Sequence, residues 1–301
     1  MGRITDLLNR IISSPNNTEE LYRIFKSIND YDLPVIRFYM PEDTFLLRQR
    51  INEKGKEFYL VSDLYYPPAI YLKNYGRANL PFQSMFYACS FPVDSSAPYP
   101  RMLTLMETSD FMKDTDSCGI ERATCSKWRT KSDVELVVLP FYEHYERACA
   151  DIQYIQALWD EGVKKTEINP DAKELVDYMS KEISKQITDS EDYFKCANFV
   201  NYLLYVNEKT KNADGIMYPS VPAAGGGFNV VLKKESADKK IEFVSAAMCY
   251  LAKNKKQSYQ MIINDSTSVS DDGVITYTPR KISEEEKMRY DSHAQGLDFV
   301  N

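Results

Sequence analysis

Long apolar runs are absent from this sequence. No window approaches the about 18 uninterrupted apolar residues that a membrane-spanning helix needs. The first residues, MGRITDLLNRII, place polar residues at helical spacing where a secretory signal would carry an apolar block. We therefore expect a cytoplasmic protein with no membrane partner.

Histidine and closely spaced cysteine are also scarce. The chain has two histidines, and its six cysteines lie far apart without a CxxC pair, so neither a zinc site nor a disulfide framework is supported. The three glycines at 225–227 lack both the GxGxxG pattern and a P-loop ending. Neither His144 nor His293 has a nucleophile elbow beside it, which disfavours a hydrolase triad. We expect reduced thiols and no bound metal or cofactor.

Positive charge is in deficit. The sequence has 37 Lys and Arg against 44 Asp and Glu, a formal net charge of −7. Binding to a polyanion depends on basic patches that displace counterions, so direct nucleic-acid binding is not expected. The composition is otherwise typical of a globular protein, with 44% hydrophobic and 27% charged residues.

Two helices are predicted at the start of the chain. Apolar residues at positions 4, 7, 8 and 11 keep a helical spacing, and Thr18 followed by two glutamates begins a second helix. We expect residues 1–30 to form a helical N-terminal extension.

Short apolar runs separated by Pro and Gly follow, which is typical of strands. Residues 34–110 contain the runs VIRFYM, FYLV, AIYL, SMFYACSF and RMLTLME. The polar residues 113–132 suggest a long loop, and VELVVLP at 134–140 suggests a buried strand.

Helices and then strands are expected in the second half. Helical spacing indicates three helices, the first from Tyr145, the second capped by Asn169 and the third starting at Ser190. Strands are predicted for IMYPSV, FNVVLK, YQMII and VITYTP, with a turn at 271–273 and a charged surface tail from Arg280. The fold class is α+β, with a main domain over 31–253 and a C-terminal addition over 254–301.

Three segments have compositions that suggest a functional site. They are GRANLP at 76–81, SMFY at 84–87 and DGIMYPS at 214–220, with the glycine-rich turn just behind. In this order they resemble the hallmark segments of the RES family, which is named for an Arg, a Glu and a Ser. The resemblance covers roughly residues 34 to 235.

The resemblance implies a core like that of ADP-ribosyltransferases, with a helical layer and with NAD in a cleft between two small twisted sheets. It implies cleavage of the nicotinamide–ribose bond of NAD, as a glycohydrolase using water or as a phosphorylase using inorganic phosphate. NAD is then a substrate rather than a cofactor. Family members are bacterial toxins or defence effectors, so an antitoxin that covers the cleft is an expected partner.

The family's residues can be carried over position by position. The resemblance assigns the catalytic Arg, Glu and Ser to Arg77, Glu107 and Ser220, with Asp110 as an alternative to the glutamate. It also assigns substrate-binding positions to Arg37, Asn79, Tyr87 and Tyr218.

The chemistry expected of such residues follows from general principles. Departure of nicotinamide leaves positive charge on the ribose, so a carboxylate such as Glu107 stabilises the transition state more than the ground state. A guanidinium presents a fork of donors to a pyrophosphate, and the adjacent Gly76 lets the backbone approach closely. Tyr87 can stack on nicotinamide, and the Ser220 hydroxyl can bind ribose or carboxamide.

Each assignment has a structural alternative. Arg77 could be a salt-bridged surface residue, Glu107 a solvated strand end, Ser220 a turn residue and Tyr87 part of the core. Two other functions also fit the sequence: a module that senses a nucleotide without cleaving it, and an enzyme that transfers ADP-ribose to a macromolecule. The choice between water and phosphate as acceptor is open.

Overall fold

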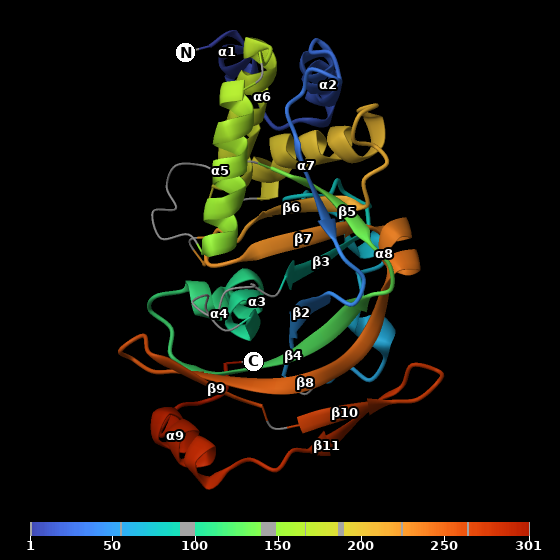
Figure 1. Ribbon diagram of the computed structural model, residues 1–301. Coiled ribbons are helices and arrows are strands. Elements are labelled where there is room, and N and C mark those ends of the chain that lie inside the picture. Colours follow the sequence, from blue (N-terminus) through green and yellow to red (C-terminus); the bar gives the residue numbers. More distant parts are fainter. Residues whose placement is uncertain are drawn as a thin grey trace.

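One large sheet with helices packed against it forms the body of the protein. The computed structural model describes residues 2–54, 56–90, 100–139, 149–165, 167–185, 190–223, 225–263 and 265–300. These residues form a nine-stranded mixed sheet and a two-stranded sheet, together with helices (Figure 1). The α+β class predicted from the sequence is confirmed.

The large sheet is built from strands along most of the chain, and its spatial order is β1-β5-β6-β7-β3-β2-β4-β8-β9. Neighbours are antiparallel except β5 and β6, which are parallel. The strands are β1 (Ile36–Met40), β2 (Phe45–Ile51), β3 (Met85–Ser90), β4 (Gly119–Thr130), β5 (Val134–Val138), β6 (Gly215–Pro219), β7 (Phe228–Lys233), β8 (Ile241–Lys253) and β9 (Tyr259–Ile263), with β10 (Asp265–Val269) and β11 (Ile275–Pro279) forming the small sheet.

The helices lie at the two ends of the sheet and across its middle. Short 3-10 turns precede α2 and α7 and occupy 61–64 and 69–71, and a π-helical turn extends α7 over Tyr202–Val206. The helices are α1 (Arg3–Arg10), α2 (Thr18–Lys26), α3 (Pro100–Thr108), α4 (Asp110–Lys113), α5 (Ala150–Lys165), α6 (Pro170–Ile183), α7 (Phe194–Asn201), α8 (Lys234–Lys240) and α9 (Glu284–Ala294).

The junction between β2 and β3 divides the large sheet into two halves. Within the described residues, β2 is paired with β3 at Leu46↔Ser90 and Leu47↔Cys89, and it is paired with β4 along its whole length. The strand pairings join all nine strands into one sheet, whereas the resemblance implied two small twisted sheets. The sheet nevertheless bends at this junction into a β1-β5-β6-β7-β3 half and a β2-β4-β8-β9 half (Figure 1).

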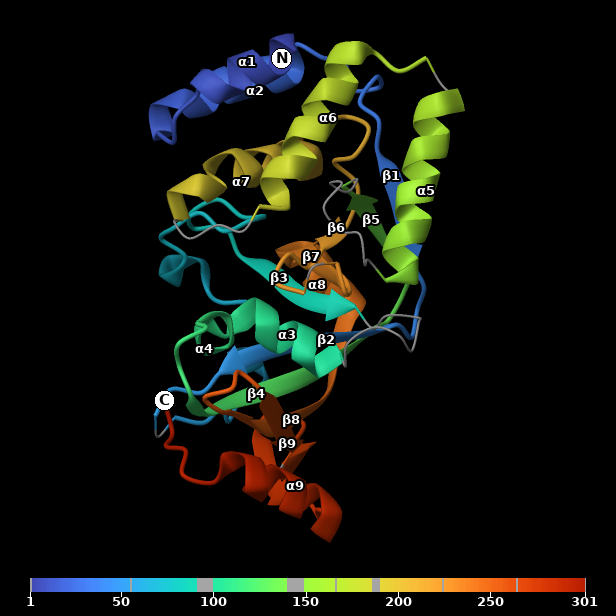
Figure 2. The same cartoon turned by 90° about the vertical axis from the view of Figure 1, so that its left-hand side faces the viewer.

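The first half of the sheet carries a helical layer. α1, α2, α6 and α7 stack above it (Figure 2), with Leu8, Phe25 and Phe199 buried in the shared core. The N-terminal helices predicted from the sequence are confirmed. Glu174 of α6 accepts hydrogen bonds from the backbone N–H groups of Ile4 (3.2 Å) and Thr5 (2.9 Å), so the extension is anchored to the body of the protein.

The helices of the second half of the chain agree with the sequence where they are described. Asn169 Oδ1 accepts a hydrogen bond from the N–H of Asp171 at 3.0 Å, which confirms the predicted cap of α6. The expected start of the preceding helix at Tyr145 lies outside the described residues, and α5 begins at Ala150.

Several predicted strands are helical or irregular. RMLTLME forms α3, because its apolar residues also have helical spacing and Met102 and Leu105 pack on the second half of the sheet. FYLV forms a single bridge at Leu60 before a 3-10 turn, and AIYL contains another 3-10 turn.

The predicted loop at 113–132 is also wrong, since residues 119–130 form β4 in the interior of the sheet. Several of its polar side chains, among them Thr124 and Ser126, are buried with hydrogen-bond partners. Thr124 donates to Asn52 Oδ1 at 2.9 Å, and Ser126 donates to the carbonyl of Arg48 at 3.0 Å. Satisfied polar groups can be buried without a large penalty, so polarity alone did not indicate exposure.

The C-terminal part joins the main sheet. β8, which the sequence did not reveal, pairs with β4 on one side and with the predicted strand β9 on the other. VITYTP forms β11, and the turn before it is confirmed at Gly273, whose φ is +80°. The charged tail lies on the surface as expected, but it contains α9, which has no buried residue.

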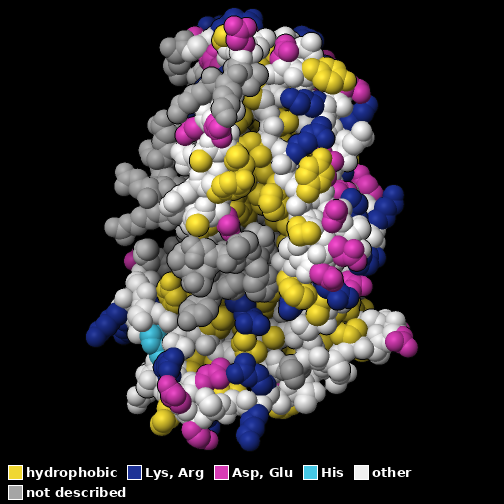
Figure 3. Space-filling model, viewed as in Figure 1, with side chains coloured by type: hydrophobic (Ala, Val, Ile, Leu, Met, Phe, Trp, Pro, Cys, Tyr) yellow, Lys and Arg dark blue, Asp and Glu magenta, His cyan; other side chains and the backbone are white. Residues whose placement is uncertain are grey.

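Apolar side chains gather on the face of the molecule that carries α5 and β1 (Figure 3). The exposed apolar residues of these two elements include Tyr154, Leu158 and Tyr39. Among the described residues, no helix combines the length and apolar character needed to cross a membrane.

Candidate functional site

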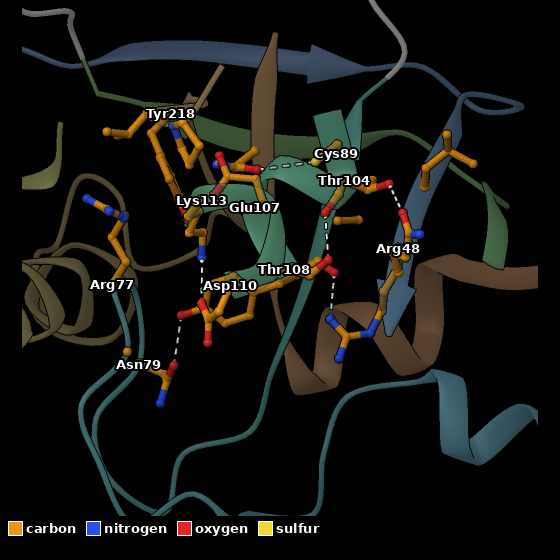
Figure 4. Close-up of a pocket in the computed structure, with 18 of the residues that line it drawn as sticks. Arg48, Arg77, Asn79, Cys89, Thr104, Glu107, Thr108, Asp110, Lys113 and Tyr218 are labelled. Atoms are coloured by element: carbon orange, nitrogen blue, oxygen red, sulfur yellow. Dashed lines mark hydrogen bonds and ion pairs between the residues drawn. The ribbon is translucent and has the colours of Figure 1, made fainter. Parts of the chain in front are cut away.

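A cavity of about 810 Å³ lies where the two halves of the sheet meet. Its walls come from β2, β3, β6 and β7, from α3 and α4, and from the turn that contains Gly76 (Figure 4). Segments far apart in the sequence therefore converge on one hollow. Its lining includes five of the seven site residues assigned from the sequence, namely Arg77, Asn79, Tyr87, Glu107 and Tyr218, and also the alternative carboxylate Asp110.

The floor of the cavity is a row of side chains across three adjacent strands. Asn229 of β7 is paired with Cys89 of β3 on one side and with Tyr218 of β6 on the other. Directly opposed residues in antiparallel strands project to the same face of a sheet. All three therefore project into the cavity, and their exposed fractions are 6% or less.

Glu107 projects from the second-last position of α3 over this floor. Its Oε1 accepts hydrogen bonds from the Ser220 hydroxyl and from Asn229 Nδ2, the latter at 2.8 Å. The structure thus brings Glu107 and Ser220 together, although 113 positions separate them in the sequence. Figure 4 shows Glu107 and Tyr218 facing the same space, with Arg77 across from them.

Ser220 is fully buried and fixed by the glycine-rich turn behind it. Its N–H donates to the carbonyl of Gly227 at 2.8 Å, and its carbonyl accepts from the N–H of Gly225 at 3.0 Å. Gly225 has a φ of +78°, a backbone conformation that residues with a side chain rarely adopt. The three glycines therefore shape a turn that holds the Ser220 hydroxyl against Glu107.

Tyr87 and Asn79 hold the turn that carries Arg77. The Tyr87 hydroxyl accepts from the N–H of Ala78 at 3.0 Å and donates to Asn79 Oδ1 at 2.8 Å. Burial raises the pKa of the Tyr87 phenol, so it remains a hydrogen-bond donor at neutral pH. Gly76 is required beside them, because an added Cβ would come within 2.2 Å of Asn79 Oδ1.

Arg77 is anchored through its guanidinium to the end of α6. Its Nη1 donates to the carbonyls of Ile183 and Lys185, the latter at 3.0 Å, and its Cζ lies 5.1 Å from the centre of the Tyr193 ring. Within the described residues, no carboxylate forms an ion pair with it. Its positive charge thus remains available on the cavity wall.

Arg48 of β2 is a cavity residue that the sequence assignment missed. Its Nη1 donates to the Tyr87 carbonyl at 2.8 Å and its Nε to the Leu64 carbonyl at 3.2 Å. Burial and the nearby charge of Arg50 lower its pKa to about 10, so it is still a cation at neutral pH. In the sequence, Arg48 follows two leucines and precedes Gln49 and Arg50, and nothing in this pattern distinguishes it from a solvated arginine.

Two assigned residues lie elsewhere or at the margin. Arg37 on β1 pairs with Glu135 at 2.6 Å and does not line the cavity, so the structure does not bring it to the other assigned residues. Asp110 lines the cavity, but its side chain is fully exposed and pairs with Lys113 at 3.3 Å. Glu107, with its two buried donors, is the better-held carboxylate.

Neither models of known protein families nor curated proteins match this chain. Within the described residues, no group of three or more His, Cys, Asp or Glu side chains is arranged to hold a metal ion. The chemistry of the cavity is therefore inferred from its own residues: one held carboxylate, two arginines without a carboxylate partner in the described residues, and a partly aromatic wall.

Proposed function

We propose that this protein cleaves the nicotinamide–ribose bond of NAD and passes the ADP-ribosyl group to water or to inorganic phosphate. The proposal combines the resemblance of its sequence segments to the RES family with the content of the cavity. The observation that carries it is the Glu107 carboxylate, held by Ser220 and Asn229 and facing a cavity of about 810 Å³.

The reaction needs a negative charge beside the reacting sugar. As the C1′–N bond breaks, its electron pair leaves with nicotinamide and positive charge develops on the ribose. Glu107 stabilises that charge, which favours the transition state over the ground state. Water or phosphate then forms a bond to C1′, a proton is released, and the products are nicotinamide with ADP-ribose or its 1′-phosphate.

The other cavity residues suit the remaining parts of NAD. Arg77 and Arg48 are two cations without carboxylate partners in the described residues, and together they suit a pyrophosphate. The Tyr218 ring suits the flat nicotinamide. The volume of about 810 Å³ lies in the range usual for small-molecule sites, which is about 300–1,000 Å³.

The deciding experiment incubates the purified protein with NAD, with and without phosphate, and follows nicotinamide and the co-product by chromatography. Glu107→Gln keeps the shape of the side chain and removes its charge, so nicotinamide release should fall by about 100- to 1,000-fold. Glu285→Gln, on the exposed α9, is the matched control and should retain full activity. Equal release by both variants would contradict the assignment of Glu107.

Two other functions are outcomes of the same experiment. Tight NAD binding without nicotinamide release would identify a nucleotide sensor. Nicotinamide release accompanied by ADP-ribose on a protein, detected by mass spectrometry, would identify a transferase.

By its resemblance to the family, we also propose that the protein acts as a bacterial toxin or defence effector restrained by an antitoxin. Induced expression should deplete cellular NAD and stop growth, whereas Glu107→Gln should do neither. Growth arrest by both forms would contradict a toxic role for the NAD chemistry.

A further inference from the structure

The hydrogen bonds around Glu107 continue into the floor of the cavity. Asn229 donates through Nδ2 to Glu107 Oε1 at 2.8 Å, and the Cys89 thiol donates to Asn229 Oδ1 at 3.3 Å. The chain of contacts is therefore thiol, amide, carboxylate. Neither Asn229 nor Cys89 was assigned a role from the sequence.

An amide group can present either its oxygen or its nitrogen to a neighbour, and only the nitrogen can donate to a carboxylate. The thiol is a donor while it keeps its proton, so it selects the amide oxygen and turns the nitrogen toward Glu107. Burial raises the pKa of Cys89 well above its usual value, and the thiol therefore stays protonated at neutral pH. The strand register keeps Cys89 and Asn229 directly opposed.

The two donors on Glu107 act on the same oxygen. Ser220 and Asn229 both contact Oε1, and in the described part of the chain no hydrogen bond reaches Oε2. Oε2 is therefore the atom available to a ligand. A carboxylate fixed through one oxygen can direct the other without rearranging during the reaction.

We infer that Asn229 is the positioning residue for the Glu107 carboxylate and that the Cys89 thiol sets the orientation of the Asn229 amide. This inference rests on the proposed function for its kinetic consequences. Asn229 contributes to turnover by holding Glu107 Oε2 toward the ribose. Cys89 acts indirectly, through its contact with the Asn229 amide.

The kinetic test compares variants at both positions with NAD as substrate. Asn229→Ala should lower kcat by about 10- to 100-fold and change KM by less than about threefold, because the lost contact acts on the transition state. Cys89→Ala should lower kcat by about fivefold, the value of one ordinary hydrogen bond. Cys89→Ser keeps a donor at this position and should restore most of that loss.

Cys249→Ala is the matched control for truncation of a buried thiol. Cys249 is 1% exposed on β8, and its sulfur approaches the carbonyl of Ala247 rather than a cavity residue. It should leave kcat unchanged even if it lowers the melting temperature. The inference about Cys89 would be overturned if kcat fell similarly in Cys249→Ala and Cys89→Ala, or if Cys89→Ser restored none of the loss. Either result would show that Cys89 has only a packing role.

Asn229→Asp gives a readout that a packing role would not change. It places a second carboxylate against Glu107, and two such groups cannot both be charged at this distance. The ratio of the kcat of Asn229→Asp to the kcat of the parent should therefore increase as the pH falls from about 8 to about 6. Cys89, Tyr218 and Arg77 face Glu107, Asp110 and Lys113 line the same cavity, and all of them are the same in both proteins. Parallel pH profiles would contradict the inference.

A crystal structure of Asn229→Ala separates this inference from the proposed function. The Glu107 carboxylate should leave its parent position when its amide donor is removed. If the carboxylate stays in place, the positioning role is wrong whether or not the parent cleaves NAD. If it moves while the parent releases no nicotinamide, the positioning role stands and the proposed function is wrong.

Discussion

Gly76 illustrates how much the cavity depends on single residues. Its N–H donates to the Asn79 carbonyl at 3.0 Å, closing the turn that presents Arg77. The space where a side chain would begin is filled by the Asn79 amide and, at 3.3 Å, by the Tyr87 hydroxyl. Any larger residue must therefore push apart the two side chains that hold the turn.

We predict that Gly76→Ala lowers NAD turnover at least about tenfold and the free energy of unfolding by about 1–3 kcal/mol. The added methyl group displaces Asn79 and with it the Arg77 guanidinium. Gly162→Ala is the control, because nothing lies within 4 Å of its added Cβ on α5 and helical propensity favours Ala. Turnover and thermal unfolding of both variants check the prediction; intact turnover in Gly76→Ala would contradict it.

Tyr87→Phe distinguishes the two roles available to Tyr87. The variant keeps the ring and loses the hydroxyl that contacts Ala78 and Asn79. An unpaired buried N–H costs about 1–3 kcal/mol, so the melting temperature should fall and KM for NAD should rise as the turn loosens. Thermal unfolding and steady-state kinetics measure these effects. Unchanged stability would show that the hydroxyl is not a structural clamp.

Arg48 is expected to favour binding at the expense of stability. Its lowered pKa of about 10 means that the folded protein releases this proton before the unfolded chain does. The charge therefore opposes folding throughout the neutral range, and this cost shrinks only as the pH rises above about 10.

Arg48→Met should accordingly bind ADP-ribose about 10- to 100-fold more weakly, while its melting temperature stays equal or rises. Calorimetric titration and thermal unfolding measure the two effects. In the parent alone, affinity should also weaken as the pH approaches about 10, where Arg48 begins to lose its charge. Tight binding by Arg48→Met would exclude Arg48 from the ligand site.

At the scale of single residues, the sequence predicted part of this site. The order of the RES-like segments led to Glu107 and Ser220, which the structure joins by a hydrogen bond. It did not lead to Asn229 or Arg48, because their roles depend on strand register and burial. Arg37 was assigned by the resemblance, but the run that contains it forms the edge strand β1, away from the cavity.

Elements whose signals are local were predicted well. Helical spacing and a capping residue suffice for α1, α2 and α6, whose ends depend on nearby backbone groups. The helix α3 and the strand β4 were not predicted correctly. RMLTLME fits either periodicity, and the polar side chains of Thr124 and Ser126 can be buried in β4 because Asn52 and the Arg48 carbonyl satisfy their hydroxyls. Such partners are distant in sequence and are not visible in a local pattern.

Helix caps offer a test at the scale of elements. Asn169 caps α6, which is packed in the core, and Ser283 caps α9, which has no buried residue. Asn169→Ala should therefore lower the melting temperature by about 2–4 °C, corresponding to about 1 kcal/mol. Ser283→Ala should leave the main unfolding transition unchanged, since α9 can fray alone. Equal shifts would show that α9 unfolds together with the core.

At the scale of the whole molecule, the cavity lies where the two halves of the sheet meet. Among the described residues, two pairs connect β2 to β3, and cavity residues lie on both strands. A ligand that contacts Arg48 on one half and Tyr218 on the other would connect the halves. Ligand binding and the rigidity of this joint are therefore expected to be coupled.

ADP-ribose should raise the melting temperature by several degrees and slow amide hydrogen exchange in β2 and β3. At a concentration about 100 times the dissociation constant, binding adds about 2.7 kcal/mol to stability. Exchange measured by mass spectrometry should show protection over 45–51 and 85–90, with little change in α9. Protection confined to α9 or to α1 would place the ligand elsewhere.

The strand order also constrains the synthesis of the protein. The first half of the sheet needs β7 between β6 and β3, and the second needs β8 beside β4, so neither half is complete until late segments are made. The cavity likewise takes residues from Leu47 to Asn229. A ribosome-bound chain that ends before Asn229 contains the arginines and the glutamate of the cavity. It still lacks the complete floor that orients them. Catalytic competence is thus withheld until translation is well advanced, and long-range strand pairing makes the final assembly slow compared with helix formation.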